Sequence, residues 1–221
     1  MKRASLVVGL VGLVGAVSLG RAAPPAHEMP HRFRDAARWA KVFEGPERDR
    51  WQRPDAVLDA LKLKGPLRVA DLGAGTGYFA VRLARRLPTG TVLALDLEED
   101  MVRYVRQRAA KEGLKNLTAA RSTASDPKLP AEGVDLLFIC NTYHHLPART
   151  EYFRRLAPRL RQGGRVVVVD FKLGKLPVGP PEHHRVAPPA LERELAAAGY
   201  RRLSLDTETL AYQYIAVYAL K

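Results

Sequence analysis

The sequence predicts a doubly wound α/β domain. Aliphatic and β-branched segments alternate with amphipathic segments of helical period along most of the chain, which is typical of a largely parallel sheet. Residues 136–139 and 166–169 are uninterrupted apolar runs, as expected for central strands with helices over both faces. No helical segment separates the last two strands, so we expect those strands to pair antiparallel.

Two helices are expected before the sheet. The first begins after Asp35, where apolar residues recur on one helical face: Ala36, Trp39, Ala40 and Phe43. Gly45 and Pro46 are expected to end it. Pro54 stands where the first turn of a helix tolerates proline, which predicts a second helix to about residue 63. We expect these helices, within residues 35–64, to form a lid over the domain that follows.

Strands and helices then alternate to the end of the chain. Strands are expected at residues 67–72, 91–96, 117–121, 134–140, 165–171, 202–206 and 211–220. Helices are expected at residues 77–87, 98–112, about 150–160 and 188–198. Together these elements predict a seven-stranded, mostly parallel sheet with an antiparallel last strand and helices on both faces.

The composition suits one globular domain. The chain has 221 residues, 47% of them hydrophobic and 27% charged, which is enough for a substantial core. A formal net charge of +13 by itself favours an anionic partner or surface. Cys140 is the one cysteine, which excludes an intramolecular disulfide and a thiolate metal cluster. We expect it to be a small buried hydrophobe.

The N-terminal segment is typical of an export signal. Lys2 and Arg3 precede an uncharged apolar run over residues 4–20, and small residues suit cleavage after Ala22. We therefore predict a signal peptide over residues 1–22, a linker over 23–34, and export to the periplasm or the cell exterior. An uncleaved segment would instead anchor the chain to the membrane or envelope, although the run is shorter than the roughly 20 apolar residues that a spanning helix prefers.

A glycine-rich turn follows the first predicted strand. It carries Gly73, Gly75 and Gly77 and leads into an amphipathic helix. Glycine lets a ligand lie against the backbone, and the first amides of a helix are oriented toward bound polar groups. The dinucleotide fingerprint needs a third glycine at the position of Tyr78, so a nicotinamide oxidoreductase is disfavoured. A phosphate loop is also disfavoured, because no Gly-Lys-Ser or Gly-Lys-Thr follows the turn.

Two acidic residues flank this turn in the predicted sheet. Asp71 precedes the glycines, where it would repel a phosphate and suits a cationic amino group. Asp96 ends the second predicted strand, about 20 residues beyond the glycines, where an acid can take both hydroxyls of a ribose. The pattern therefore favours a ribose-bearing ligand without a phosphate.

These motifs resemble those of the class I S-adenosylmethionine-dependent methyltransferases. The resemblance rests on VADLGAGTG at residues 69–77, LALDLEEDM at 93–101, and VDLLFI at 134–139 with NTYHHL behind it. It covers roughly residues 65–220 and implies a Rossmann-like domain over residues 65–221 with S-adenosylmethionine as its cofactor.

The resemblance also implies positions for the cofactor contacts. Asp71 and the turn would hold the methionine moiety, and Asn141 would lie near it. Asp96 would hold the ribose, and Leu97 and Met101 would contact the adenine. In this family, a stretch after the third strand usually offers an acid and a backbone amide to the adenine. In this chain Thr123 stands in place of the acid, and Asp126 is a candidate substitute. The full set of expected cofactor contacts is Asp71, Gly73, Ala74, Gly75, Gly77, Asp96, Leu97, Met101, Ala124 and Asn141.

The acceptor is expected above the carboxyl ends of the central strands. His144 and His145 follow the strand at residues 134–140, and either can take a proton from an acceptor hydroxyl or amine. A strong base is not required, because methyl transfer depends mainly on in-line positioning. A second pair of histidines, at residues 183–184, can line the mouth of the acceptor site. No metal is expected, since no ligand spacing on a common helix supports one.

The sequence therefore favours an enzyme that transfers a methyl group to a small-molecule acceptor. No nucleic acid is expected despite the charge, because the fourth strand lacks the Asn/Asp-Pro-Pro-Tyr/Phe stretch of base-methylating enzymes and no target-recognition domain is present. S-adenosylmethionine is made in the cytosol, which conflicts with export. The alternative is therefore an exported, non-catalytic binding protein that keeps the fold.

Overall fold

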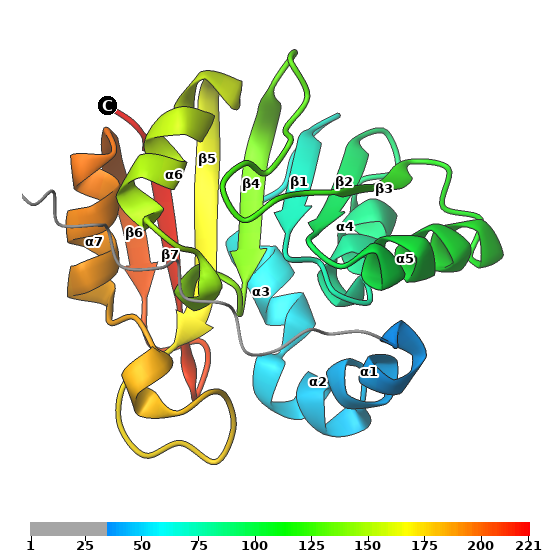
Figure 1. The fold of residues 1–221 in the computed structure, drawn as a ribbon, viewed down its shortest axis with the longest axis horizontal. Coiled ribbons are helices and arrows are strands. Elements are labelled where there is room, and N and C mark those ends of the chain that lie inside the picture. The colour runs from blue at the N-terminus through cyan, green and yellow to red at the C-terminus, as the bar shows by residue number, and fades with distance from the viewer. Residues whose placement is uncertain (1–34) are drawn as a thin grey trace, which may run out of the picture.

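The computed structural model describes residues 35–221, so the predicted export signal and linker lie outside the described residues. The described chain forms a seven-stranded sheet in the order β3-β2-β1-β4-β5-β7-β6, with helices around it (Figure 1). The strands from β1 to β5 pair in parallel, and β7 is antiparallel to both β5 and β6. The predicted fold class is confirmed, including the antiparallel last strand.

The strands agree closely with the predicted segments. They are β1 (Arg68–Leu72), β2 (Thr91–Asp96), β3 (Leu117–Arg121), β4 (Val134–Cys140), β5 (Leu160–Phe171), β6 (Tyr200–Asp206) and β7 (Gln213–Leu220). The main difference is that β5 begins at Leu160 rather than Arg165. Its pairing with β4 is irregular between Val134 and Leu136, and Leu160 pairs with Val134 ahead of this irregularity.

The helices include one that the sequence analysis missed. They are α1 (Ala36–Phe43), α2 (Pro46–Gln52), α3 (Pro54–Ala60), α4 (Tyr78–Arg86), α5 (Glu99–Lys111), α6 (Arg149–Leu156) and α7 (Pro188–Ala197). Pro46 ends α1 as predicted, but it also begins α2, because proline at the first helical position loses no hydrogen bond. Arg53, in the left-handed conformation at φ 47°, separates α2 from α3.

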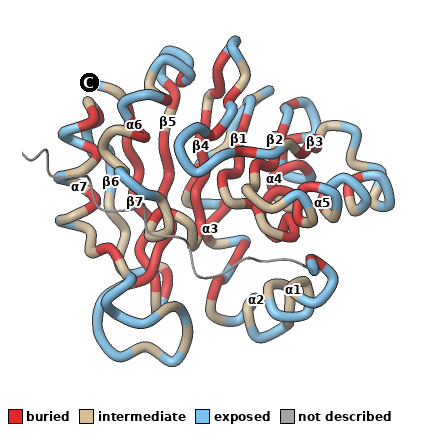
Figure 2. The backbone as a smooth tube through the Cα atoms, viewed as in Figure 1, coloured by how far each residue is buried: buried red, intermediate tan, exposed pale blue. Residues whose placement is uncertain are grey.

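Alternate side chains of the central strands enter two hydrophobic cores. In β4, Leu136 and Phe138 belong to one core, and Leu137 and Ile139 belong to the other. The first core includes residues of α3, α4 and α5, and the second includes residues of α6 and α7. Figure 2 shows the buried strands between more exposed helices. Each large apolar side chain buried in this way stabilises the fold by roughly 1.5–3 kcal/mol.

The carboxyl ends of the strands are bordered by α1, α2 and the loop after β5, residues 172–187 (Figure 1). Trp39 and Phe43 stack on α1 with ring centroids 5.3 Å apart, as expected for residues on one face. Ligands of open parallel sheets bind at this edge, so these segments frame the candidate site. None of the helices within residues 35–221 has the length and apolar character needed to cross a membrane.

Candidate functional site

The glycine turn after β1 is held by both neighbouring strands. The backbone amides of Gly73 and Ala74 donate to the carbonyl of Leu95 in β2, at 2.8 and 3.0 Å. Gly73 has φ 73°, and a Cβ atom there would lie 2.3 Å from Oγ1 of Thr142, which follows β4. Only glycine therefore fits this position. The side chain of Ala74 packs into the first core, so this predicted contact has its amide and its side chain already engaged.

The side-chain carboxylate of Asp71 is buried, and its hydrogen bonding is incomplete. Its side chain is 2% exposed, and Oδ2 has no hydrogen-bond partner within residues 35–221. Burial raises the pKa of Asp71 to about 7, although the positive charge of Arg48 opposes this rise. An unpaired buried carboxylate costs free energy, which a cationic ligand group would offset. The site therefore fits the ammonium group that the sequence analysis placed here.

Arg48, on α2, lies near this carboxylate; the sequence placed it in the expected lid but not among the cofactor contacts. Its Nη1 donates to the carbonyl of Phe43 at 2.8 Å, and its guanidinium lies 3.8 Å from the centroid of the Tyr78 ring. Its Nε atom is buried and has no partner among the described residues. The sequence signal for its placement was Pro46, which marks the start of a helix as well as the end of one.

Asp96 lies across the turn from Asp71. Its carboxylate accepts hydrogen bonds from the backbone amides of Gly75, at 2.8 Å, and Glu98, at 3.0 Å. Burial raises the pKa of Asp96, while these two amides act in the opposite direction. A carboxylate has roughly four acceptor positions, so Asp96 can still accept from ligand hydroxyls.

The predicted adenine contacts differ in how the structure places them. Met101 is 1% exposed and belongs to neither of the two core clusters. Leu97 is half-buried, and Ala124 is exposed in the loop after β3. The candidate substitute acid, Asp126, is exposed and forms an ion pair with Lys128 at 2.9 Å. Its backbone is joined to Thr123, whose hydroxyl accepts from the Asp126 amide at 3.0 Å and donates to the Asp126 carbonyl at 3.1 Å.

A cluster of three carboxamides joins α2 to the ends of two strands. Asn141, after β4, donates from Nδ2 to Oε1 of Gln52 at 3.3 Å and accepts from Nε2 of Gln213. Gln52 in turn donates to Oε1 of Gln213, at the start of β7, and both glutamines are fully buried. The neighbouring Cys140 is also buried, and burial raises the pKa of its thiol well above the usual range. Its predicted place as a buried side chain is confirmed.

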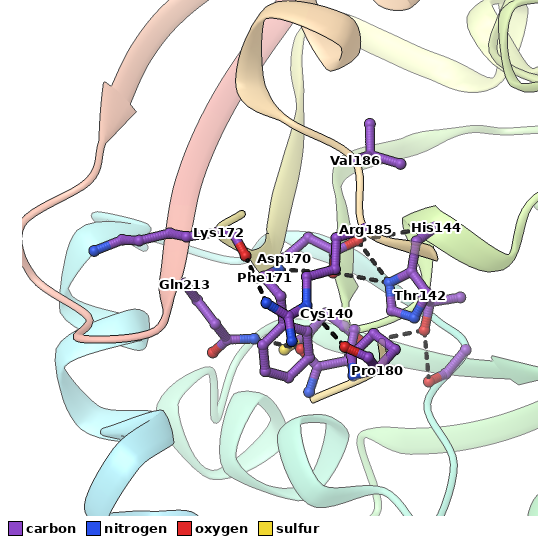
Figure 3. Close-up of polar contacts among 12 residues, drawn as sticks. Cys140, Thr142, His144, Asp170, Phe171, Lys172, Pro180, Arg185, Val186 and Gln213 are labelled. Atoms are coloured by element: carbon purple, nitrogen blue, oxygen red, sulfur yellow. Dashed lines mark hydrogen bonds and ion pairs between the residues drawn. The ribbon is translucent and has the colours of Figure 1, made fainter. Parts of the chain in front are cut away.

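The two candidate histidines have different surroundings. Both lie in a short 3₁₀ helix, η1 (Tyr143–His145), after β4. Nδ1 of His144 lies 2.8 and 3.0 Å from the two carboxylate oxygens of Asp170, near the end of β5 (Figure 3). The His144 side chain is 3% exposed and that of Asp170 is fully buried. The His145 ring packs on His144 with centroids 4.1 Å apart.

The remaining residues at this edge of the sheet are weaker candidates for a catalytic role. His183 and His184 are exposed, in the loop after β5. Trp51, on α2, packs against Phe171 at the end of β5, with centroids 5.8 Å apart. Within residues 35–221 no group of three or more histidine, cysteine and acidic side chains could hold a metal ion.

Comparison with known proteins identifies the domain. A family model described as a methyltransferase domain matches residues 69–164. A malonyl-(acyl-carrier protein) O-methyltransferase from Methylococcus capsulatus is 30% identical over 178 residues, which cover 75% of this chain and 64% of that protein. An aklanonic acid methyltransferase from a Streptomyces strain is 30% identical over 131 residues, covering 58% and 60%. The chain thus spans less than two thirds of the length of these curated relatives.

Solved structures agree with this match. The structure of an S-adenosylmethionine-dependent methyltransferase from Aquifex aeolicus superposes with a TM-score of 0.78 and 26% identity, covering 85% of this chain and 99% of that one. The glycine turn and the acids at Asp71 and Asp96 belong to the motifs on which the sequence resemblance rests. The described chain is a class I S-adenosylmethionine-dependent methyltransferase domain, and S-adenosylmethionine is the cofactor that its family and fold indicate.

Proposed function

We propose that this protein is an enzyme that transfers a methyl group from S-adenosylmethionine to a hydroxyl or amine of a small-molecule acceptor. The observation that carries the proposal is the His144–Asp170 pair, buried at the carboxyl edge of the sheet. A histidine oriented by a carboxylate suits a reaction in which the attacking group must lose a proton.

The cofactor site supports this proposal. Bound S-adenosylmethionine supplies an electrophilic methyl group on a sulfonium centre. Asp71, with its unpartnered Oδ2, would take the ammonium group, and Asp96 would take the ribose hydroxyls. Met101 would contact the adenine. The remaining predicted contacts, at Gly73, Gly75, Gly77, Leu97, Ala124 and Asn141, belong to the same proposal.

His144 would act as the general base. When its Nδ1 proton is donated to Asp170, the lone pair of Nε2 is left to accept the proton of the acceptor. The backbone amide of Phe171 also donates to Asp170, at 2.8 Å, which keeps the carboxylate in place. We assign the role to His144 because the Asp170 carboxylate, 2.8 Å from its Nδ1 atom, orients this ring.

The names of the relatives support a small organic acceptor. They include an aklanonic acid methyltransferase and, at 30% identity, a trans-aconitate 2-methyltransferase from Afipia carboxidovorans. Both names specify an acidic organic molecule. The net charge of +13 would raise the local concentration of such an acceptor.

The test is a turnover assay with methyl-labelled S-adenosylmethionine and a panel of small hydroxyl, amine and carboxylic acid compounds. Formation of S-adenosylhomocysteine together with a methylated product, lost in Asp96→Ala, is the expected result. Tight binding of S-adenosylhomocysteine with no turnover of any acceptor would favour the non-catalytic binding protein instead.

We propose further that residues 1–22 direct export of the chain, with the linker at 23–34 joining them to the folded domain. The support is Lys2 and Arg3 ahead of an apolar run. Mass measurement of the chain recovered from cell fractions tests this: a chain beginning at Ala23 outside the cytosol is expected. A full-length chain in the membrane fraction would indicate the uncleaved anchor, and a full-length cytosolic chain would contradict export.

A further inference from the structure

We propose that Glu194 of α7 is a positioning residue for His144. It holds the hydroxyl of Tyr143, the residue directly before His144, and Arg149 holds Glu194 in turn. This inference rests on the proposed function, because it concerns the orientation of the proposed general base. It adds a second support for η1, from α7, besides the support that Asp170 of β5 gives to the His144 ring.

Tyr143 anchors η1 in the second hydrophobic core. Its side chain is fully buried, and its ring lies 5.5 Å from that of Phe153 on α6, measured between centroids. Its hydroxyl donates a hydrogen bond to Oε2 of Glu194 at 2.7 Å. Burial, together with this hydrogen bond, raises the pKa of Tyr143 far above its usual range, so the hydroxyl remains a donor. The anchor is therefore a directional polar contact as well as an apolar one.

Glu194 is itself fixed by Arg149, the first residue of α6. Nε and Nη2 of Arg149 donate to the two carboxylate oxygens of Glu194, both at 2.7 Å, in a bidentate pair. Although burial acts to raise the pKa of Glu194, the hydrogen bonds from Arg149 and Tyr143 lower it, so the carboxylate is ionised at neutral pH. Two parallel hydrogen bonds leave the acceptor of the Tyr143 hydroxyl little freedom to move.

The short helix η1 depends on such contacts for its position. It is a single 3₁₀ turn, and runs of this kind have poorer hydrogen-bond geometry than an α-helix. Asp170 fixes the direction of the His144 ring, and Glu194 fixes the adjoining backbone through Tyr143. Loosening of η1 would displace Nε2 of His144 from the acceptor, and a small misplacement of a reacting group is costly in rate.

The experiment removes the Tyr143 hydroxyl and retains its ring. In Tyr143→Phe we expect kcat to fall about 10-fold, with the affinity for S-adenosylhomocysteine within about twofold of wild type. Long-range ¹H–¹⁵N spectra of the histidine rings provide a readout that needs no acceptor, because they report which ring nitrogen carries the proton. The His144 signal, assigned with His144→Gln, should change from the Nδ1-protonated form to a mixture of the two tautomers.

Tyr200 offers a matched control in the same core. It is 1% exposed, its ring also packs on Phe153, and its hydroxyl donates to the carbonyl of Phe153 at 2.9 Å. Tyr200→Phe therefore removes a comparable buried hydrogen bond, and we expect a similar loss of stability. Neither kcat nor the His144 signal should change, which separates positioning of the base from general loosening of the core.

Variants of Glu194 test the same contact from α7. The Glu194 side chain is 26% exposed, so its replacement leaves no large cavity if Tyr143→Phe fails to fold. Glu194→Ala should reproduce the changes in kcat and in the His144 signal. Glu194→Gln keeps an acceptor oxygen for Tyr143 and should retain kcat within about threefold of wild type. Glu192→Ala, which breaks an ion pair with Arg202 on the same helix, should change neither readout.

Three results would overturn the inference. An unchanged His144 signal in both Tyr143→Phe and Glu194→Ala would do so and would leave the proposed function standing. Equal changes in Tyr143→Phe and Tyr200→Phe would show that the core as a whole, rather than the contact with Glu194, supports the base. Full turnover by His144→Ala would overturn the proposed role of His144 together with the inference.

Discussion

Nδ1 of His144 lies 2.8 Å from Oδ1 of Asp170, and both side chains are almost completely buried. Asp170 also accepts hydrogen bonds from the backbone amides of His144, at 3.3 Å, and Phe171, at 2.8 Å. These contacts fix the ring and direct Nδ1 toward the carboxylate. In the proposed reaction, the other ring nitrogen, Nε2, would accept the proton of the acceptor.

His144→Ala is expected to lower kcat by about 10²- to 10⁴-fold while leaving the affinity for S-adenosylmethionine within a few-fold of wild type, because general-base catalysis contributes on this scale. His145→Ala is the matched control, since His145 packs against the His144 ring. We expect it to reduce kcat far less. Steady-state kinetics with a saturating acceptor measure the effect. Equal losses in the two variants would contradict the assignment of His144.

The sequence predicted the sheet well because its strands carry strong local signals. The predicted limits of β2, β3 and β4 match the structure, since each strand is an apolar run bounded by turn residues. The two helices at the N-terminus were harder to predict. Pro46 was interpreted as a stop alone, although proline both ends one helix and begins the next.

The site was less predictable, because its polar contacts join residues far apart in the sequence. The sequence could not choose between His144 and His145, since the choice depends on which ring meets Asp170 after the chain turns through η1. Nor did it show that Lys128 engages Asp126. The position of Arg48 beside Asp71 depends on how α2 packs against the ends of β1 and β4, which the helix signal at Pro46 does not reveal.

Cofactor affinity should depend on pH through Asp71. Its pKa is raised to about 7 by burial, so the carboxylate is largely protonated below pH 7 and ionised above it. A cationic ammonium group needs the ionised form. The affinity for S-adenosylhomocysteine, measured by calorimetry, is therefore expected to rise between pH 6 and 8 and then level off. Asp71→Asn should bind more weakly and show a flatter profile. A wild-type affinity that is constant over this range would contradict the prediction.

The raised pKa of Asp71 also affects the stability of the ligand-free protein, which is expected to fall with rising pH while the cofactor affinity rises. The folded-state pKa of Asp71 is raised above its ordinary value of 3.8, so the folded state holds this proton more tightly than the unfolded state. The contribution of Asp71 is therefore fully present below about pH 4 and is lost as the pH rises to about 7. Urea unfolding at pH 5 and pH 8 should show a smaller pH-dependent loss in Asp71→Asn than in wild type. An identical pH dependence of the unfolding free energy in the two proteins would contradict this prediction.

The carboxamide cluster should behave as a coupled unit. Gln52→Leu removes a partner from both Asn141 and Gln213, and leaving buried amides unpaired is expected to lower the free energy of unfolding by about 1–3 kcal/mol. The double variant Gln52→Leu/Gln213→Leu should be less destabilised than the sum of the two single changes. Urea unfolding of the four proteins forms a double-mutant cycle. Additive effects would show that the two glutamines act independently.

Gly73→Ala should disrupt the turn through a specific clash. The added Cβ would lie 2.3 Å from Oγ1 of Thr142, at a position with φ 73°. Overpacking and left-handed strain together are expected to cost about 2–4 kcal/mol of unfolding free energy and to weaken cofactor binding.

Gly113 separates the two contributions to this cost. It has φ 67°, but a Cβ atom there would meet nothing within 4 Å. Gly113→Ala should therefore cost only the backbone strain, about 1 kcal/mol, and leave cofactor binding unchanged. If the clash with Thr142 accounts for the difference, Thr142→Gly should recover part of the stability lost in Gly73→Ala. Equal destabilisation by the two glycine substitutions, with no recovery from Thr142→Gly, would show that backbone strain alone fixes Gly73.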